Sequence, residues 1–496
     1  MKRISTSALP LGFLLSVLCL RAGADVPTVI PDRVLAASDA ASYDVLGYGL
    51  AVDDSTLLVG SRGCDTPQVN SGAVYAYRRI ASQWTQTQKL VFNGAQRDDQ
   101  IGFAVALSGS IAVAGAPRRG ASGAAFILRF DGGTWFSQAE INDASSSTGS
   151  AFGSAVACLP SIIAIGAPNS SEGVGAGAGR VRIYDRPVQT WVQGQLLKAP
   201  FPDPGDQFGS AVALSGELLA VAAPGDDDFE INSGAVYLYQ RISGQYQLRA
   251  KIFSPLPVAE DSFGRSVALN GTTLVVGAYR SDLAAFNGGA AFVYNVSQEG
   301  LATYARTLLP PVGAINAEFG NSVATDGTGI IIGAPGFATS GSLHGASWLY
   351  LNGDTVPEAV LSSAGGSAMD LCCTRVAISS IAAVAGAPGM QVGILPSAGT
   401  TLLFDRLRDC NTSGIPDAIE IATGTLLDAN MDGIPDACQC IGDFTGDGSV
   451  NGGDLGILLG VWGVVPSNFP QVDLNRDGLI NGADLGLLLS NWGACS

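Results

Sequence analysis

Histidine is almost absent from this chain, since His344 is the single one among 496 residues. A zinc site built from several histidines is therefore excluded, and a Ser-His-Asp or Cys-His catalytic centre would have only this residue to use. Charged residues are also scarce, at 14%, and the acidic ones outnumber the basic ones by 43 to 26. The net charge of −17 argues against a nucleic-acid partner, because nucleic acid is itself polyanionic.

Long apolar runs are missing too, since no stretch reaches the ~18 residues that a membrane-spanning helix needs. The N-terminal run Leu11–Leu20 follows Lys2 and Arg3 and leads into Ala22-Gly23-Ala24. That order of charged, apolar and small residues predicts a secretory signal peptide over residues 1–24. Removal of Cys19 with it leaves eight cysteines, an even number that suits an oxidising compartment. We therefore expect a secreted protein, in the extracellular space or at the cell surface, with no transmembrane anchor.

Glycine, by contrast, is abundant, with 65 residues, almost twice the usual share of ~7%. Many of these glycines belong to a recurring pattern: Phe-Gly-x-x-Val-Ala, an apolar run ending in Gly-Ala-Pro, a polar loop, and Gly-Ala-Val-Tyr-x-Tyr. The clearest copy occupies residues 208–213, 218–224 and 234–239. The glycine of the first motif recurs at Gly47, Gly102, Gly153, Gly209, Gly264 and Gly320, and Cys373 takes its place in a seventh copy. A period of roughly 50 residues indicates a repeat architecture of seven units.

Each unit contains short apolar runs bounded by turn residues, and most units add a fourth run such as 84–91, 191–197 or 246–252. Four strands per unit predict a mainly β fold, a seven-bladed β-propeller over residues 25–407. The glycines fit this fold because a Cβ would clash where inner strands crowd the central channel, and because turns between blades need positive φ. The seventh unit supplies Thr400–Phe404 as its third strand but no fourth. We expect the N-terminal strand Arg33–Leu35 to complete that blade and remove an exposed edge.

These motifs resemble the FG-GAP repeats of the integrin α-subunit propeller and its bacterial relatives, over residues 32–407. Blades of that family often hold calcium in an Asp-rich loop between the first two strands. Here the corresponding loops, such as 213–217 and 324–328, contain no Asp-x-Asp-x-Asp series. The triplet Asp226-Asp227-Asp228 lies in a different loop, and we interpret it as a solvated turn.

The composition changes after Arg408, and two twelve-residue loops follow in the segment 440–496. Each loop has oxygen-bearing side chains at positions 1, 3, 5, 9 and 12 and glycine at position 6, where an EF-hand loop turns most sharply. A backbone carbonyl would contribute at position 7. This spacing suits a hard cation with six to eight oxygen ligands and predicts bound calcium. The predicted ligands are Asp443, Thr445, Asp447, Ser449, Asn451 and Asp454 in the first loop, and Asp473, Asn475, Asp477, Leu479, Asn481 and Asp484 in the second.

Each loop leads into an apolar stripe at helical spacing, which we expect to form the core of a small α-helical module. The stripes are Leu455, Leu458, Leu459 and Trp462, and Leu485, Leu488, Leu489 and Trp492. Aspartate at position 12 and the single following helix resemble the type I dockerin module. That resemblance implies a cohesin-like domain on a scaffold protein, or another protein, as the partner of this EF-hand module. At positions 10 and 11, where the family often has Ser-Thr, the chain has Gly452-Gly453 and Gly482-Ala483.

The linker 408–439 between the two modules resembles thrombospondin type 3 calcium repeats. The resemblance implies further calcium ligands in this linker. They are Asp409, Asn411, Ser413 and Asp417, and Asp428, Asn430, Asp432 and Asp436. A disulfide between Cys410 and Cys438 would enclose the linker, and one between Cys440 and Cys495 would join the two ends of the C-terminal module. Sequence alone does not fix this connectivity. The adjacent Cys372 and Cys373 cannot both point to one face of a strand, and their state stays open.

Two functions fit these observations. The first is a secreted calcium-binding, non-enzymatic adhesion or ligand-binding protein, in which the propeller displays a surface for a glycan or protein and the tail docks. The alternative is a dockerin-bearing, polysaccharide-degrading enzyme, an O-glycosyl hydrolase or lyase, which would need two carboxylates flanking the scissile bond. No catalytic constellation stands out, and the box Asp131-Gly132-Gly133-Thr134-Trp135, which faintly resembles that of sialidases, fits an ordinary turn before a strand. We therefore favour binding over catalysis.

Overall fold

The computed structural model describes two parts of the chain. In the N-terminal part these are residues 28–29, 31, 33–80, 83–310, 314–339, 342–343, 345–363 and 370–405. In the C-terminal part they are 420–421, 425–426, 442, 444, 449–464, 472–474 and 478–494. The predicted signal peptide, all eight predicted ligands of the linker and the four cysteines from Cys410 onward lie outside the described residues.

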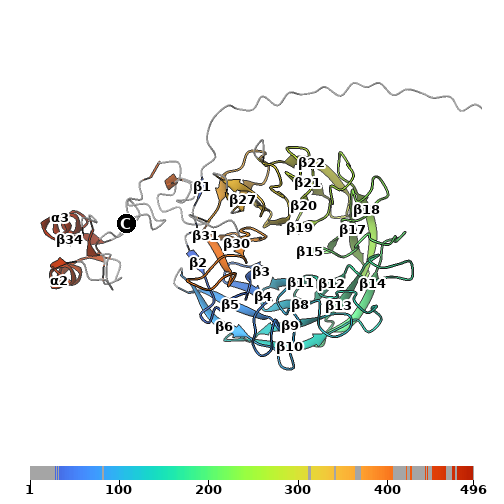
Figure 1. The fold of residues 1–496 in the computed structure, drawn as a ribbon, viewed down its shortest axis with the longest axis horizontal. Helices are drawn as coiled ribbons and strands as arrows, with labels where there is room; N and C mark the ends of the chain where they lie inside the picture. The colour runs from blue at the N-terminus through green and yellow to red at the C-terminus, as the bar shows by residue number, and fades with distance from the viewer. Residues whose placement is uncertain are drawn as a thin grey trace, which may run out of the picture.

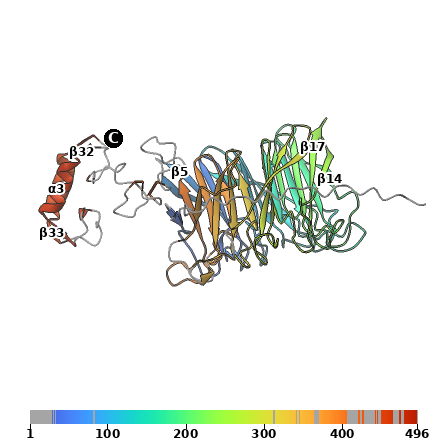
Figure 2. The ribbon, with the colours of Figure 1, turned by 90° about the horizontal axis from the view of Figure 1, so that it is seen from above.

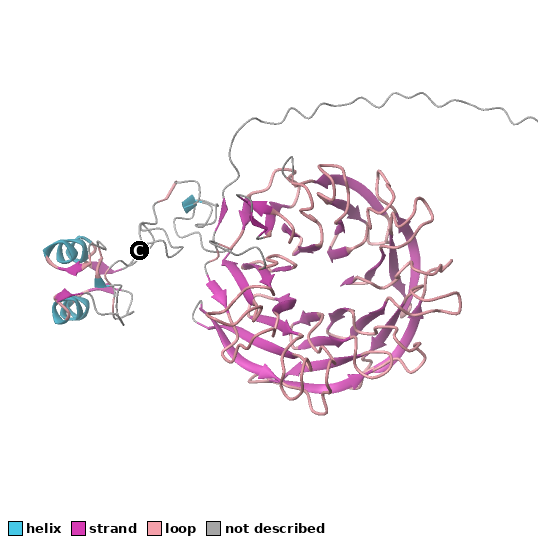
Figure 3. Cartoon of the chain, viewed as in Figure 1, coloured by secondary structure: helices cyan, strands magenta, loops and turns pink. Residues whose placement is uncertain are grey.

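The N-terminal part forms seven sheets arranged as a ring, with the chain running around it from one sheet to the next (Figure 1). Strands and loops build the whole ring (Figure 3), and Figure 2 shows it from the side. The predicted seven-bladed β-propeller is therefore confirmed. Blades are numbered 1 to 7 along the chain, and their strands run outward from the centre of the ring. Six blades have four strands, and blade 6 has a fifth.

The innermost strands are β3 (Leu46–Val52), β7 (Val105–Ser108), β11 (Ala155–Leu159), β15 (Val212–Ser215), β19 (Ser266–Asn270), β23 (Ser322–Thr325) and β29 (Arg375–Ile378). The second strands are β4 (Thr56–Ser61), β8 (Ile111–Ala116), β12 (Ile162–Ala167), β16 (Leu218–Ala223), β20 (Thr273–Ala278), β24 (Gly329–Ala334) and β30 (Ala382–Ala387).

The third strands are β5 (Ala73–Ile80), β9 (Ala124–Phe130), β13 (Arg180–Asp185), β17 (Ala235–Ile242), β21 (Ala290–Val296), β27 (Ala346–Leu351) and β31 (Thr400–Asp405). The outer strands are β6 (Gln83–Leu90), β10 (Trp135–Ile141), β14 (Val192–Leu197), β18 (Gln245–Ile252), β22 (Ala302–Leu308), β28 (Ala359–Leu361) and β2 (Arg33–Leu35). A small hairpin of β25 (Ala338–Thr339) and β26 (Ser342–Leu343) projects from blade 6.

The second strand is the most deeply buried part of every blade, with all six residues buried in each of the seven copies. Both faces of this strand pack against neighbouring blades, so its sequence is a continuous apolar run, as in Leu218–Ala223, rather than an alternating one. The outer strand β18 instead places many side chains in solvent. The cores lie between adjacent blades, and one of them joins Ala164 of blade 3 to Leu219 of blade 4.

The ring closes as the sequence predicts. Strand β2 pairs antiparallel with β31, with Val34 opposite Leu402, and so supplies the outer strand of blade 7. A second N-terminal strand, β1 (Thr28–Val29), pairs parallel with β28 on the outside of blade 6. The sequence analysis missed β1, because two residues carry no periodic signal. The N-terminal segment therefore completes blade 7 and adds a fifth strand to blade 6.

The repeated glycines lie where neighbouring blades meet, which corrects the expectation that they relieve crowding within the channel. A Cβ on Gly166 of blade 3 would lie 1.9 Å from the carbonyl oxygen of Gly209, the first-motif glycine of blade 4. Gly209 itself has a φ of +88°, a conformation that favours glycine. The same approach recurs at Gly60 with Gly102, Gly115 with Gly153, Gly277 with Gly320, Gly333 with Cys373 and Gly386 with Gly47. Backbone therefore packs directly on backbone from blade to blade.

In four of the seven blades, the second tyrosine of the Tyr-x-Tyr motif, or the residue at its position, joins the blade to the one before it. The Tyr294 hydroxyl in blade 5 donates a hydrogen bond to the Phe253 carbonyl, just beyond the outer strand of blade 4, at 2.9 Å. Equivalent bonds run from Tyr77 to Ala36, from Tyr184 to Asn142 and from Tyr239 to Lys198. Burial raises the pKa of Tyr184 to about 12, so the hydroxyl keeps the proton that it donates.

Candidate functional site

The C-terminal part contains two equivalent loop–helix units. Helix α2 (Gly452–Gly460) begins after Asn451, and helix α3 (Gly482–Ser490) begins after Asn481. Each asparagine accepts a hydrogen bond from the backbone two residues later, and Asp454 or Asp484 accepts one from the asparagine N–H at 2.8 Å. These reciprocal bonds form a capping box that fixes positions 9 and 12 of each predicted loop.

The two units also exchange short strands. Strand β32 (Ser449–Val450) in the first loop pairs with β35 (Gly493–Ala494) beyond the second helix. Strand β34 (Leu479–Ile480) in the second loop pairs with β33 (Gly463–Val464) beyond the first helix. Each unit is therefore completed by the other, so the pair acts as one module.

Asp473, at position 1 of the second loop, has the surroundings of a cation ligand. Its Oδ2 accepts a hydrogen bond from the backbone N–H of Gly478 at 2.9 Å, which folds the loop back on itself. Its side chain is only 7% exposed, and its Oδ1 is buried without a hydrogen-bond partner among the described residues. A buried, unpartnered carboxylate oxygen is costly in the absence of a positive charge, so the residues fit calcium.

The other predicted ligands are only partly described. Asn451, Asp454, Leu479, Asn481 and Asp484 lie at the loop ends just described, and both aspartates are fully buried. Of Ser449 the backbone is described, in β32. Asp443, Thr445, Asp447, Asn475 and Asp477 lie outside the described residues. Among the described residues no group of three acidic, histidine or cysteine side chains forms a metal cluster.

The core of this module is smaller than the sequence predicts. Leu458 and Leu488 are fully buried, together with Val450, Val472 and Ile480. However, Leu459, Trp462, Leu489 and Trp492 are each about half exposed, between 48% and 51%, which corrects their assignment to the core. The physical reason is size, since two nine-residue helices bury only one narrow face against each other.

In the propeller, Asp226 also departs from its interpretation as part of a solvated turn. It is 2% exposed, accepts a hydrogen bond from the Tyr237 hydroxyl at 2.9 Å and lies 2.7 Å from the Lys251 ammonium group. Asp227 and Asp228 are exposed, so the interpretation holds for these two residues of the triplet. Asp226 is thus a paired structural carboxylate.

Two buried carboxylates in blade 3 come closest to a catalytic pair, but both are neutralised. Asp143 lies 3.3 Å from Arg180 and 3.1 Å from Arg182, and Glu172 contacts Arg180 and Lys198. Burial alone would raise the pKa of Asp143, but the Ser145 hydroxyl and Arg182 hold it below its usual range. Lys198, Ser170 and Arg180 lower the pKa of Glu172 in the same way. Neither carboxyl group is therefore set up as the proton donor that glycoside hydrolysis requires.

An aspartate that recurs three positions before the first-motif glycine also has a structural role. In Asp44, Asp99 and Asp206, Oδ2 accepts a hydrogen bond from the backbone N–H three residues earlier. Burial raises the pKa of Asp206 and of Asp261 to about 6. Both side chains are 3% exposed or less, so a substrate cannot reach them. The sequence analysis missed this set, although the recurrence of Asp three positions before the first-motif glycine was a readable signal.

The box at Asp131 is a turn, as interpreted from the sequence. Its Oδ1 accepts hydrogen bonds from the backbone N–H groups of Gly133 and Thr134, and Trp135 then opens β10 as a buried residue. The adjacent cysteines, whose state the sequence left open, lie in a turn and not in a strand, and Cys372 and Cys373 are both buried with their Sγ atoms 2.8 Å apart. The positive φ of Cys373, +67°, brings both side chains together just before β29.

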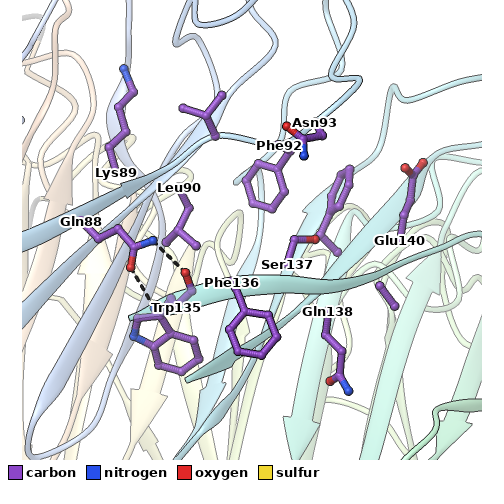
Figure 4. A pocket seen from close by; sticks show the side chains of 13 residues that line it. Gln88, Lys89, Leu90, Phe92, Asn93, Trp135, Phe136, Ser137, Gln138 and Glu140 are labelled. Atoms are coloured by element: carbon purple, nitrogen blue, oxygen red, sulfur yellow. Dashed lines mark hydrogen bonds between the residues drawn. The ribbon is translucent and has the colours of Figure 1, made fainter. Parts of the chain in front are cut away.

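A groove of about 620 Å³ lies between the outer strands β6 and β10 of blades 1 and 2 (Figure 4). The Gln88 amide bridges the two strands, donating to the Trp135 carbonyl at 2.7 Å and accepting from its N–H at 2.8 Å. At the rim, Lys89 pairs with Asp39 and Glu140 pairs with Arg119. Because these polar groups already have partners, we interpret the groove as a structural contact between two blades and not as a reactive site.

Comparison with known proteins agrees with this architecture. Five segments match the FG-GAP repeat family: 32–77, 84–128, 191–239, 247–294 and 303–350. The first of these runs from β2 to β5, so the matched unit begins with the outer strand of the preceding blade. No curated protein matches the chain. Among the described residues, no helix is long and apolar enough to cross a membrane.

One similar solved structure is a Bacteroides uniformis protein provisionally described as a 6-phosphogluconolactonase. It is 11% identical over 63% of this chain and 87% of its own, with a TM-score of 0.42. That likeness is too low to support any argument about activity. The repeats and the closed ring lead to one conclusion: the chain is a seven-bladed β-propeller that carries FG-GAP repeats.

Proposed function

We propose that this protein is a secreted, calcium-binding, non-enzymatic adhesion or ligand-binding protein. The propeller displays a binding surface for a glycan or protein, and the C-terminal module docks to a cohesin-like scaffold or another protein. The observation that carries the proposal is Asp473, whose Oδ2 closes its loop on Gly478 while its buried Oδ1 has no partner in the described part of the chain.

Calcium would be held by two sets of oxygens in the module. The first set is Asp443, Thr445, Asp447, the Ser449 carbonyl, Asn451 and Asp454, and the second is Asp473, Asn475, Asp477, the Leu479 carbonyl, Asn481 and Asp484. The ion would supply the positive charge that allows these carboxylates to lie close together. The linker loops at 409–417 and 428–436 would bind further calcium and stiffen the connection to the propeller.

Binding is favoured over catalysis because the buried carboxylates of the propeller are paired or inaccessible wherever the chain is described. Secretion rests on the N-terminal signal pattern and on the even number of remaining cysteines. The polysaccharide-degrading alternative, a hydrolase or lyase, is kept as an outcome of the test below.

Calorimetric titration of the full chain with calcium tests the proposal directly. We expect calcium binding that weakens on the order of tenfold or more in Asp473→Ala, because a charged ligand is lost. Asp131→Ala serves as the control, since Asp131 closes only a surface turn. Equal calcium affinity in all three proteins would remove the basis of the proposal. A glycan-binding screen run beside a hydrolysis screen then tests the propeller, and turnover of any glycan would overturn the non-enzymatic assignment.

A further inference from the structure

The repeat is broken at a few positions, and these positions meet at the centre of the ring. Five blades have proline after the second strand, but blades 1 and 5 have Arg62 and Tyr279 there. After the first-motif glycine, three blades have Ser or Thr, whereas blades 1, 2 and 5 have Tyr48, Phe103 and Arg265. Blade 7 adds Arg375 at the start of its innermost strand.

Two of these arginines share one aromatic ring. The guanidinium carbon of Arg62 lies 3.8 Å from the centre of the Tyr48 ring, and that of Arg375 lies 5.1 Å from it. The two guanidinium carbons are therefore within about 9 Å of each other. The Phe103 ring, 5.0 Å from the Tyr48 ring, extends the aromatic surface into blade 2.

Arg265 is connected to the same group through side-chain contacts. Its guanidinium lies 5.2 Å from the Tyr279 ring, and its Nε donates to the Asn321 side chain at 3.2 Å. The Asn321 amide donates to the Thr374 carbonyl, which also accepts from Arg375 at 3.0 Å. A continuous chain of contacts thus links the arginines of blades 5 and 7.

These three arginines lack the counter-charges found elsewhere in the protein. Among the described residues, no carboxylate lies within the 4 Å of an ion pair with Arg62, Arg265 or Arg375, whereas the neighbouring Arg280 pairs with Glu260 at 3.7 Å. Burial lowers the pKa of Arg375, and the charges of Arg265 and Arg62 lower it further. Three cations gathered without an anion, in a chain of net charge −17, are unfavourable unless a ligand compensates them.

We propose that Arg62, Arg265 and Arg375 form an anion-binding site at the centre of the propeller, for a ligand that carries one or more carboxylates. The guanidinium group matches a planar carboxylate with two parallel hydrogen bonds. Tyr48 and Tyr279 hold the arginines by stacking beneath them, which limits their motion before the ligand arrives. The ligand is either the acidic end of a sugar chain or a small free polycarboxylate, which share this chemistry. The site rests on the proposed ligand-binding role of the propeller and does not involve the calcium loops.

Titration calorimetry at low ionic strength on the full chain, without added calcium so that citrate cannot chelate it, tests the site. The probes are trigalacturonate, citrate, the neutral sugar maltotriose and inorganic sulfate. We expect at least one carboxylate probe to bind and maltotriose to give no signal. The double variant Arg62→Gln/Arg375→Gln should bind that probe on the order of tenfold or more weakly. Arg97→Gln, the control for the single variant Arg62→Gln, removes one positive charge from an exposed surface position and should bind like the parent chain.

Thermal melting separates binding from folding. The parent chain should melt at a higher temperature with the bound probe, and the double variant should not respond. If the double variant does not fold, Arg62→Gln alone carries the test. Binding of trigalacturonate alone identifies the acidic sugar as the source, and binding of citrate alone identifies a small polycarboxylate.

The absence of binding by both carboxylate probes, binding of sulfate alone, or equal binding by the double variant would overturn the site. If calcium titration of the same sample is normal, such a result removes this site and leaves the proposed function of the tail. A loss of calcium binding with intact probe binding would do the reverse.

Discussion

The propeller and the C-terminal module are both built from repeats, but different forces hold them together. Each blade of the propeller buries a complete second strand, and neighbouring blades share cores such as the one between blades 3 and 4. In the described residues of the C-terminal module, five apolar side chains are fully buried and two tryptophans are half exposed. A repeat therefore stabilises a fold only when stacking the units covers their apolar faces. The propeller achieves this by closing into a ring, whereas two short helices do not.

Calcium removal should separate the two regions most strongly. The aspartates of each loop repel one another without a cation, and the small core does not offset that repulsion. We expect EGTA to abolish the helical circular dichroism of a 440–496 fragment, and Asp443→Ala with Asp473→Ala to do the same. A 25–407 fragment should keep its melting temperature. A 440–496 fragment that is equally helical with and without calcium would contradict the view that calcium, and not an apolar core, holds the tail together.

Removal of the closing strand should be the next largest effect, and it should act on the propeller alone. Deletion of residues 25–37 removes β1 and β2 and exposes the edges of β28 and β31. We expect a loss of about 4 kcal/mol or more, from lost burial and lost strand pairing, together with faster aggregation. Thermal melting and light scattering measure both. An unchanged melting temperature would mean that the ring does not depend on its closure.

Adding a methyl group between blades should cost slightly less. In Gly166→Ala the new Cβ would lie 1.9 Å from the Gly209 carbonyl oxygen, so the two blades must separate. We expect about 3 kcal/mol of destabilisation by chemical denaturation. Ala222→Gly is the matched control, because Ala222 occupies in blade 4 the position that Gly166 has in blade 3. The Ala222 Cβ is already accommodated there, and it lies 3.2 Å from the place where a Cβ on Gly264 would be. Comparable effects of the two changes would show that the blade contact is not the cause.

The two regions should respond to pH in opposite directions. Burial raises the pKa of Asp261 to about 6, above its ordinary value of 3.8, so the folded propeller binds this proton more tightly than the unfolded chain. Its contribution is most favourable below the ordinary value and is lost as the pH rises through about 6. Asp261→Asn should therefore raise the melting temperature near pH 8 and have little effect near pH 4. Helicity of the tail should instead fall on acidification, because protonated carboxylates release calcium.

An Asp261→Asn variant that melts below the parent near pH 8 would show that the charged carboxylate stabilises the blade. Asp131→Asn is the control, since Asp131 lies in an exposed turn and faces no such burial.

The smallest effect should come from single contacts between blades. Tyr294→Phe removes a partly buried hydrogen bond to the Phe253 carbonyl, and we expect a loss of about 1 kcal/mol in chemical denaturation. Tyr350→Phe is a matched control, because the buried Tyr350 hydroxyl has no partner among the described residues. Its removal should be neutral or slightly stabilising. A larger loss in Tyr350→Phe than in Tyr294→Phe would argue against tyrosine as the link between blades.

The sequence by itself determined the number of blades, the strand order within them and the closure of the ring. The spacing of seven first-motif positions, from Gly47 to Cys373, defined the repeat, and Arg33–Leu35 stood at the right distance to complete blade 7. These features are local or periodic, and a linear pattern records them directly. The capped helices after Asn451 and Asn481 were predictable for the same reason.

Only the tertiary structure decided which residues meet across blades. Gly166 and Gly209 are 43 positions apart, and their contact depends on the register between two sheets, which no local pattern encodes. The burial of Asp226 against Lys251 and the exposure of Trp462 follow from the way elements pack, although both residues look ordinary in the sequence. The central arginines are the clearest example of such a contact. Arg62 and Arg375 come from opposite ends of the propeller sequence, and both can lie over the Tyr48 side chain only once blade 7 has closed against blade 1.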